Sequence, residues 1–258
     1  MYMPQQFVRF AKGGQNFYGR IEGDEVIVLQ GNIFEDYIET KTTYSLTNIH
    51  PVTPCSPKTI VCVGLNYRLH AAELHMELPK IPIIFLKPTT TLLAPFGEIK
   101  YWPMVNQLDY EGELAIIIGK KCHQVKECEA LNYVFGYSIA NDITARDLQR
   151  QDGQWTRAKS FDTFLPLGPF ITTGIDPSDL KIETYLNGQV KQSSQTSDMI
   201  FSVPYIVSFI SQIMTLHPGD VIITGTPSGI GPMEIGDEVE VRIEGLGNLI
   251  NKVSTPLL

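Results

Sequence analysis

The first fifty residues alternate between apolar and polar positions, a pattern typical of half-buried β-strands. This alternation predicts strands over Phe7–Phe10, Asn16–Glu22 and Glu25–Leu29. The pairs Gly13-Gly14 and Gly23-Asp24, which favour tight turns, separate these strands. The start of the chain is therefore expected to form a small β-rich unit.

A polar, threonine-rich stretch begins at Thr40 and leads to three prolines between positions 51 and 57. Prolines restrict the residue before them to extended conformations, so this stretch reads as a linker. We predict a domain boundary here. A small N-terminal β-rich domain would span residues 1–55, and a larger domain would span residues 56–258.

The rest of the chain mixes short apolar runs with a few helical patterns. Apolar residues recur at helical spacing over Val203–Met214, which predicts an amphipathic helix. Strands outnumber helices and do not alternate regularly with them, so a mixed, β-rich (α+β) fold is favoured over a doubly wound sheet. The remaining expected elements are strands at Thr59–Gly64, Ile83–Leu86, Glu111–Gly119, Phe135–Asn141, Leu180–Leu186, Gln189–Gln192, Asp220–Thr224 and Glu238–Ile243, and short helices at Val125–Leu131 and Thr144–Arg150.

Two glutamates, Glu111 and Glu113, stand at the entrance to one of these strands. Side chains two apart on a strand share a face, so the two carboxylates are expected side by side. A solvated strand edge would explain such a pair, but Leu114–Ile118 is apolar on both faces and continues into the interior. Two buried anions repel each other unless a cation neutralises them. Oxygen ligands favour a hard ion, so we predict Mg²⁺ or Mn²⁺ here.

Asp142 is the candidate third ligand, at the point where a strand gives way to the predicted helix over Thr144–Arg150. The same place suits a residue that merely caps the helix. Arg146 and Gln149 are three residues apart and are expected on the helix face that points toward Asp142. Lys159 offers an ammonium that would offset three carboxylates around a dication and bind an anionic substrate, although a solvated lysine is the alternative.

His70 and Glu73 lie in the polar, helix-prone stretch NYRLHAAELHMELPKIP. Their spacing of three residues brings them within reach on one helical turn. A glutamate that orients a histidine makes it a stronger general base. Two unrelated surface residues would show the same spacing.

The glycine-rich segment TGTPSGIGP follows a predicted strand. It lacks the Gly-Lys-Ser/Thr of a phosphate loop, so a nucleotide-dependent enzyme is not favoured. We expect a tight turn that offers backbone N–H groups and the Thr226 hydroxyl to a carboxylate.

Composition narrows the classes of function. The chain has 20 basic and 28 acidic residues, a net charge of −8 that disfavours nucleic-acid binding. No apolar run approaches the roughly 18 residues of a membrane span, and the first residues do not resemble a signal peptide. The four cysteines show no disulfide or zinc spacing, so free thiols and a cytoplasmic location are expected.

Taken together, these segments resemble the fumarylacetoacetate hydrolase family. The resemblance covers about the last two hundred residues and consists of seven blocks in the family's order. These are VGLNYRLHAAEL (Val63–Leu74), PIIFLKP (Pro82–Pro88), DYEGELAIIIGK (Asp109–Lys120), GYSIANDITARDLQ (Gly136–Gln149), AKSFDTFLPLGP (Ala158–Pro169), MIFSVPYIVSFIS (Met199–Ser211) and GDVIITGTPSGIGP (Gly219–Pro232).

The resemblance implies a β-sheet roll that holds one Mg²⁺ or Mn²⁺ and a chain that forms a homodimer. It implies metal ligation by Glu111, Glu113 and Asp142, substrate contacts from Arg146, Gln149, Lys159 and Thr226, and a mobile lid that carries His70 and Glu73. The short chain and its H-x-x-E lid look most like the acylpyruvase and oxaloacetate decarboxylase branch. The longer hydrolases use a fourth acidic ligand, which this sequence does not obviously show, so fumarylacetoacetate itself is disfavoured as substrate.

Two functions follow from this resemblance, and a third belongs to another class. The first is metal-dependent C–C cleavage of a small 2-oxo acid, either acylpyruvate hydrolysis or oxaloacetate decarboxylation, through an enolate stabilised by the cation. The second is isomerisation or tautomerisation of a related oxo-dicarboxylate, such as oxaloacetate or a 2-hydroxydienedioate, which would only reprotonate that enolate. The third is a non-catalytic calcium- or ligand-binding module, against which Lys159 in a matching block argues.

Overall fold

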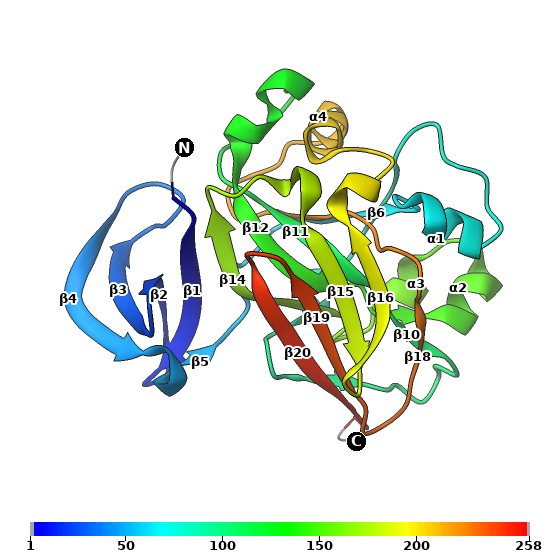
Figure 1. The fold of residues 1–258 in the computed structure, drawn as a ribbon, viewed down its shortest axis with the longest axis horizontal. Coiled ribbons are helices and arrows are strands. Elements are labelled where there is room, and N and C mark those ends of the chain that lie inside the picture. Colours follow the sequence, from blue (N-terminus) through cyan, green and yellow to red (C-terminus); the bar gives the residue numbers. More distant parts are fainter. Residues whose placement is uncertain (1–2, 257–258) are drawn as a thin grey trace.

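The computed structural model describes residues 3–256 and shows three β-sheets with four short α-helices, a mixed, β-rich α+β fold. The largest sheet runs in the order β4-β3-β2-β1-β14-β12-β11-β17-β6-β7, and β5 and β8 pair with β1 and β14 (Figure 1). Its strands are β1 (Gln5–Lys12), β2 (Gln15–Glu22), β3 (Glu25–Gly31), β4 (Tyr37–Ser45), β5 (His50–Pro51), β6 (Ile60–Gly64), β7 (Ile83–Leu86), β8 (Leu92–Leu93), β11 (Gly112–Ile118), β12 (Val134–Asn141), β14 (Leu165–Thr173) and β17 (Val221–Ile223).

Two smaller sheets and the helices complete the larger part of the chain. One sheet has the order β16-β15-β19-β20-β9, and the other has the order β13-β10-β18. Their strands are β16 (Gln189–Gln195), β15 (Lys181–Leu186), β19 (Glu238–Ile243), β20 (Gly247–Ser254), β9 (Glu98–Lys100), β13 (Thr144–Ala145), β10 (Leu108–Tyr110) and β18 (Gly231–Met233). The helices are α1 (Arg68–Glu73), α2 (Arg146–Asp152), α3 (Thr156–Lys159) and α4 (Val203–Ile213).

The N-terminal strands β1 to β4 form an antiparallel unit that lies at one side of the molecule (Figure 1). Strand β1 also pairs antiparallel with β14, so this unit extends the main sheet. The three strands expected from alternation are confirmed. The threonine-rich stretch from Thr40, expected to be part of an extended linker, instead forms the later part of β4. Most side chains of β4 are exposed or half-buried, so no apolar alternation marked it in the sequence.

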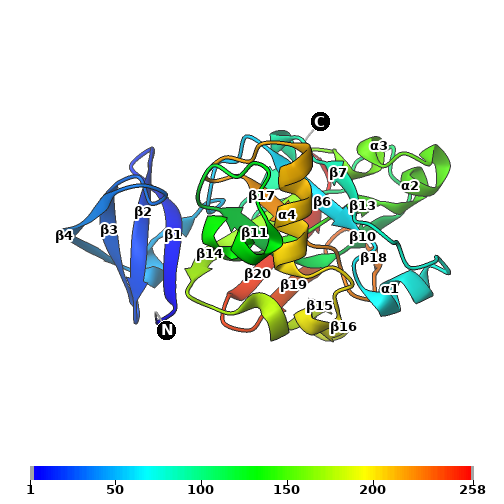
Figure 2. The same cartoon turned by 90° about the horizontal axis from the view of Figure 1, so that it is seen from above.

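Strand β11 lies in the middle of the main sheet, between β12 and β17. Its side chains Ile116 and Ile118 pack into a core that also contains Ile206 and Ile210 of α4, and Figure 2 shows α4 lying across this part of the molecule. Ala115 and Ile117 of the same strand belong to a second core on the opposite face. Burial on both faces explains why the sequence is apolar without alternation here.

Three predicted elements near the site are corrected by the structure. The expected strand from Glu111 is interrupted at that residue, with β10 before it and β11 after it. The helix expected over Thr144–Arg150 is a two-residue strand followed by α2, which begins at Arg146, so Asp142 does not cap it. The helix expected over Val125–Leu131 is a 3₁₀ helix over Glu127–Tyr133.

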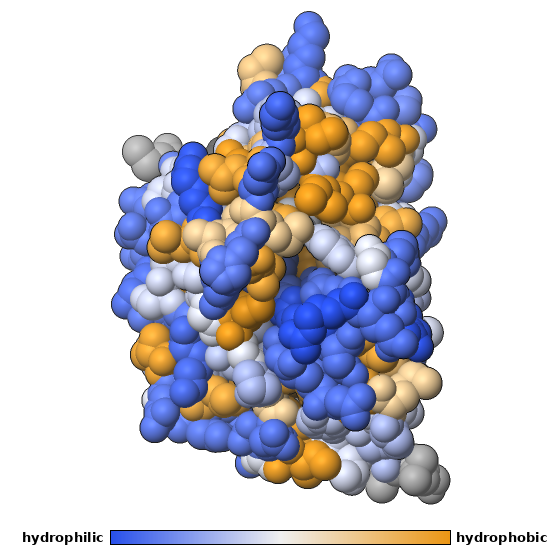
Figure 3. Space-filling model, turned by 90° about the vertical axis from the view of Figure 1, so that its right-hand side faces the viewer, coloured by the Kyte–Doolittle hydropathy of each residue, from blue (hydrophilic) through white to orange (hydrophobic). Residues whose placement is uncertain are grey.

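The helices α1, α2 and α3 gather at the end of the molecule away from the N-terminal unit (Figures 1 and 2). Figure 3 shows this end, where hydrophobic side chains lie next to a strongly hydrophilic area. None of the helices formed by residues 3–256 has the length and apolar character that crossing a bilayer requires.

Candidate active site

Three carboxylates meet at the ends of β11 and β12. One oxygen from each of Glu111, Glu113 and Asp142 lies within 4.8 Å of the others, and all three residues are buried. The predicted convergence of these three side chains is therefore present in the structure.

Local backbone pairing produces this convergence. The Asp142 N–H donates to the Glu111 carbonyl at 2.8 Å, and the Glu111 N–H donates to the Asn141 side-chain oxygen at 2.9 Å. Gly112, between the two glutamates, faces β15 of the five-stranded sheet, where a Cβ would collide with Thr184 Oγ1. A glycine is thus required for both carboxylates to point away from that sheet into the site.

Two buried lysines bind the acidic cluster. Lys159 Nζ donates to Glu111 Oε2 at 2.7 Å and to Asp142 Oδ2 at 2.6 Å. Lys87, at the end of β7, donates to Asp142 Oδ1 at 2.5 Å and to the Ile143 carbonyl at 3.3 Å. Both oxygens of Asp142 therefore accept hydrogen bonds from an ammonium.

Arg146 adds a third buried cation. Its Nη2 contacts Glu111 Oε1, its Nε donates to Asp109 Oδ2 at 2.8 Å, and its Nη1 donates to Gln149 Oε1 at 2.6 Å. Within the described chain, four buried carboxyl groups thus face three buried cations, so the cluster has one carboxyl group without a matching cation.

The pKa values of Glu111 and Glu113 shift in opposite directions. Burial raises the pKa of Glu111, but the charges of Lys159 and Arg146 outweigh burial and hold this pKa well below its usual range. Burial, then the charges of Asp142 and Glu111, raise the pKa of Glu113 well above its usual range. Glu113 accepts a hydrogen bond from the Gly225 N–H at 2.7 Å and has no ion pair with a side chain in residues 3–256. Glu113 is therefore the carboxylate whose charge lacks a partner.

The donor set suits a hard dication. Three carboxylates offer only oxygen, the ligand type that Mg²⁺ and Mn²⁺ prefer. Each carboxylate oxygen has more than one lone pair, so a hydrogen bond from a lysine still leaves an acceptor site. A dication would also supply the positively charged partner that Glu113 lacks. The residues present fit Mg²⁺ or Mn²⁺.

His70 and Glu73 of α1 form the predicted pair. His70 is buried, and its Nδ1 lies 3.0 Å from Glu73 Oε2. The other oxygen of Glu73 accepts a hydrogen bond from the Gly229 N–H at 2.9 Å, in the glycine-rich turn. Glu73 is therefore held from two sides, and it fixes the orientation of the imidazole.

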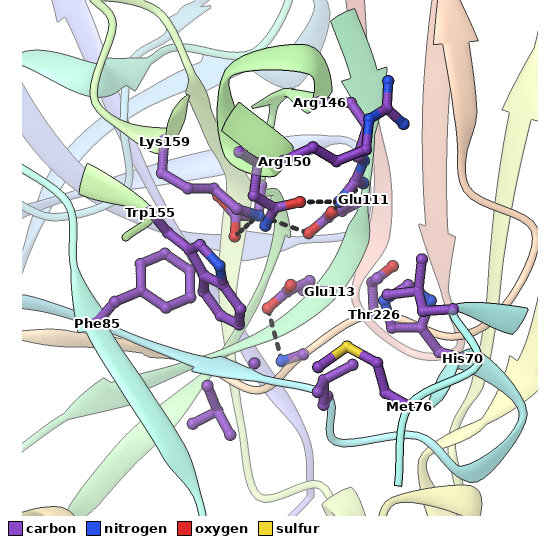
Figure 4. Close-up of a pocket in the computed structure, with 17 residues that line it drawn as sticks. His70, Met76, Phe85, Glu111, Glu113, Arg146, Arg150, Trp155, Lys159 and Thr226 are labelled. Carbon is purple, nitrogen blue, oxygen red and sulfur yellow. Dashed lines mark hydrogen bonds and ion pairs between the residues drawn. The ribbon is translucent and has the colours of Figure 1, made fainter. Parts of the chain in front are cut away.

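These groups line one cavity of about 310 Å³. Figure 4 shows His70 and Met76 on one side of it and Phe85 and Trp155 on the other, with the acidic side chains between them. The size lies at the lower end for small-molecule sites, so a small ligand is expected.

The cavity brings together most of the predicted site residues. It is lined by His70, Glu111, Glu113, Asp142, Arg146, Gln149, Lys159 and Thr226. Glu73 stands behind His70. The Thr226 hydroxyl donates to the Gly112 carbonyl at 2.9 Å and accepts from Gln192 at 2.8 Å, so its hydrogen is already engaged. In the glycine-rich turn, the Gly225 N–H donates to Glu113 of the protein itself.

Sequence reasoning did not single out four polar residues of this region: Lys87, Gln107, Asp109 and Arg150. Lys87 had a visible signal, because a lysine that ends the apolar run PIIFLKP is expected to need a buried partner. Arg150 had none, since a charged residue near the end of a short helix is usually solvated.

Comparison with known proteins identifies the family. Residues 59–254 match the family model described as fumarylacetoacetate (FAA) hydrolase C-terminal. The chain belongs to the fumarylacetoacetate hydrolase family. Residues 6–50 match a second model, described as Rv2993c-like, N-terminal.

Several members of the fumarylacetoacetate hydrolase family are similar over most of the chain. Human oxaloacetate tautomerase FAHD2B, mitochondrial, is 44% identical over 220 residues, which is 81% of this chain and 69% of that protein. The crystal structure of 2-hydroxyhepta-2,4-diene-1,7-dioate isomerase from Mycobacterium marinum is 41% identical, with a TM-score of 0.91 over 97% of this chain and 98% of that one. The fumarylacetoacetate hydrolase of Exiguobacterium antarcticum is 35% identical, with a TM-score of 0.85 over 98% of this chain and 100% of that one. The chain is therefore a member of an enzyme family that includes isomerases, tautomerases and hydrolases.

Proposed function

We propose that this protein is a Mg²⁺- or Mn²⁺-dependent tautomerase or isomerase of a small 2-oxo dicarboxylic acid. The reaction would move one proton between C3 and the 2-oxo oxygen, or along a conjugated double bond. C–C cleavage, the first hypothesis from the sequence, becomes the second candidate. The relatives named as a tautomerase and an isomerase are 44% and 41% identical to this chain, and the relative named as a hydrolase is 35% identical.

The observation that supports proton transfer most strongly is the His70–Glu73 pair beside the acidic cluster. Because the Glu73 carboxylate accepts at Nδ1, Nε2 is the ring nitrogen left to exchange a proton with a substrate. No partner for Nε2 is found among residues 3–256, and His70 lines the cavity. A single base in this position is enough for tautomerisation, because the proton that it takes from one atom is returned to another.

The roles of the other residues follow from their contacts. When bound by Glu111, Glu113 and Asp142, a divalent cation would polarise the keto oxygen of the substrate and so make the proton at C3 more acidic. His70 Nε2 would take this proton and return it, a contribution of about 10²- to 10⁴-fold. Lys159 would hold two of the three carboxylates in place, and Gln149 would offer its amide N–H groups to the substrate.

Hydrolytic C–C cleavage needs the same groups and, in addition, a water molecule. His70 would then deprotonate water instead of C3. The family membership and the similarity to the Exiguobacterium antarcticum enzyme support this second candidate.

One assay separates the two candidates. Enol-oxaloacetate is added to the purified protein with Mg²⁺, and the ultraviolet absorbance of the enol is followed together with release of pyruvate. Tautomerisation predicts rapid loss of enol absorbance without pyruvate. Release of pyruvate and carbon dioxide at the same rate would favour C–C cleavage by decarboxylation, the form of cleavage that needs no attacking water. If the enol is lost no faster than with Mg²⁺ alone, the proposed function is wrong.

We also propose that the chain forms a homodimer through the end of the main sheet. Strand β7 is an edge of that sheet within the described chain, and edges with apolar side chains favour pairing or burial. Six large apolar side chains are exposed on α1, on β7 and between them: Leu69, Met76, Leu78, Ile81, Ile83 and Leu86. Light scattering at micromolar concentration should give twice the chain mass, and a monomer would contradict this proposal.

A further inference from the structure

The cations that line the cavity differ in how they are neutralised. Lys159 and Arg146 are buried, and each is paired with two carboxylates. Arg150 is exposed at the cavity, and its Nη2 donates to the neutral amide oxygen of Gln107 at 2.8 Å. No carboxylate lies within ion-pair distance of Arg150 in residues 3–256. Its full charge is therefore available to a ligand.

From this difference we propose that Arg150 is the specificity-determining residue that binds the distal carboxylate of a 2-oxo dicarboxylic acid. The inference rests on the proposed function and names the substrate class of the same site. A guanidinium binds a carboxylate through two parallel N–H donors, which gives both affinity and orientation.

Helix α2 places Arg150 where this contact is possible. Arg146, Gln149 and Arg150 lie three and four residues apart, so they share one face of the helix, and all three line the cavity. Arg146 stands nearest the acidic cluster, because it contacts Glu111. Arg150 lies one turn further along, so the helix presents donors at two levels, one beside the cluster and one beyond it.

Gln107 positions Arg150 without neutralising it. The side-chain N–H of Gln107 donates to Asp109 Oδ1 at 3.0 Å, which leaves its oxygen to face the guanidinium. Asp109 in turn accepts from Arg146. A carboxylate in place of this amide would pair with Arg150 and compete with a ligand. This series of hydrogen bonds, from Arg146 through Asp109 and Gln107, therefore holds Arg150 in place without neutralising its charge.

The charge balance of the cavity explains why a second carboxylate needs Arg150. The buried cluster contains one more carboxylate than cations, so it has no spare positive charge of its own. A dication bound there would receive the 2-oxo acid head group. The side chains of Phe85, Trp155 and Met76 on the cavity walls carry no charge. A distal carboxylate would therefore find its one uncommitted cation among the described lining residues at Arg150.

The test compares ligands that differ by one carboxylate. L-malate and L-lactate share a 2-hydroxy acid head group, and only malate carries a distal carboxylate. Calorimetry in Mg²⁺ with the wild type, R150Q, R150K and R157Q gives dissociation constants without any turnover. Arg157 is a matched control, because it is an exposed arginine paired with Asp152 and does not line the cavity.

We expect the wild type and R157Q to bind malate more tightly than lactate. R150Q should weaken malate binding about ten- to a hundredfold and change lactate binding less than about twofold. The malate affinity of R150K should fall between those of the wild type and R150Q, because a lysine keeps the charge but not the paired donors. In the kinetic assay, R150Q should raise KM for enol-oxaloacetate by a similar factor with kcat nearly unchanged.

The inference is wrong if the wild type binds the two acids alike or fails to bind malate, or if R150Q weakens both acids equally. Failure of the proposed function is a separate result. If the protein prefers malate through Arg150 but does not accelerate loss of the enol, the role of Arg150 stands and the proposed tautomerase function is wrong.

Discussion

The N-terminal unit and the active site bury their residues for different reasons. The N-terminal core contains Val8, Phe10, Val26, Val28 and Ile49, all apolar, and it gains stability from removal of this surface from water. The active site buries carboxylates, two lysines and an arginine. Buried ion pairs contribute little net stability, because desolvation offsets their attraction. Burial therefore stabilises the first region, whereas in the second region, the candidate active site, it brings a desolvation cost.

The largest expected effect is a loss of turnover without a loss of fold. His70→Ala should lower kcat about 10²- to 10⁴-fold, because the general base is removed. Its free energy of unfolding should fall by no more than about 1–2 kcal/mol, since the buried His70 side chain makes one side-chain hydrogen bond, to Glu73, within residues 3–256. Glu73→Gln is the matched variant and should lie between His70→Ala and the wild type. Equal turnover in His70→Ala and the wild type would contradict the assigned base.

The opposite result is expected in the N-terminal core. Phe10 is fully buried, and Phe10→Ala should lower the free energy of unfolding by about 3–5 kcal/mol, because it leaves a cavity. Where the protein remains folded, kcat should stay within about twofold of the wild type. Urea unfolding and the enol assay measure the two quantities. A large fall in kcat in fully folded Phe10→Ala would show that the regions are coupled.

Substitution of Glu113 should raise stability while removing metal binding. The raised pKa of Glu113 means that the folded metal-free protein keeps a proton that the unfolded chain releases. This contribution to stability is complete below the ordinary pKa of 4.5 and is lost as the pH rises through the folded-state pKa. Glu113→Gln keeps the shape without the charge, so its advantage over the wild type should grow with pH to about 1–3 kcal/mol.

Urea unfolding in chelator at pH 5 and pH 8 tests this prediction. Added Mg²⁺ should then stabilise the wild type and leave Glu113→Gln unchanged. Glu238→Gln, which alters an exposed residue on β19, is the control and should show no such pH dependence. A difference between Glu113→Gln and the wild type that is the same at both pH values would contradict the origin given for it.

The smallest effect concerns the cysteines, of which Cys55, Cys62 and Cys122 are buried and Cys128 is exposed. Burial raises the pKa of Cys55 to about 12 and that of Cys62 well above its usual range, so neither thiol forms the reactive thiolate near neutral pH. At pH 8 a thiol reagent should label one cysteine quickly in the native protein and four after unfolding. Rapid labelling of two or more in the native state would contradict this burial.

The two regions also differ in how far their sequence predicts them. In the N-terminal unit, alternation located β1 to β3, but it missed β4, whose side chains are mostly not buried. In the site, the pairing of Glu111 with Glu113 and the spacing of His70 and Glu73 were visible, because each depends on local geometry. The partners of Lys87 and Arg150 lie 55 and 43 residues away in the chain, so local geometry did not identify them, although the apolar run before Lys87 signalled that this lysine needs a buried partner.

The start of α2 illustrates a second limit. A helix from Thr144 capped by Asp142 was a sound local prediction, yet Asp142 binds two lysines, and Thr144 and Ala145 pair with β10. Tertiary contacts outweighed the local preference for a cap. The ion pairs of Asp142 with Lys87 and Lys159 thus take the place of the cap that its position in the sequence suggested.

A crystal structure of the protein grown with Mg²⁺ and oxalate tests the central claim most directly. Oxalate resembles the head group of a 2-oxo acid and cannot react. We expect one ion between Glu111, Glu113 and Asp142, with oxalate bound to it and His70 Nε2 facing the ligand. An ion bound elsewhere, with these three carboxylates contacting only the lysines and Arg146, would contradict the account.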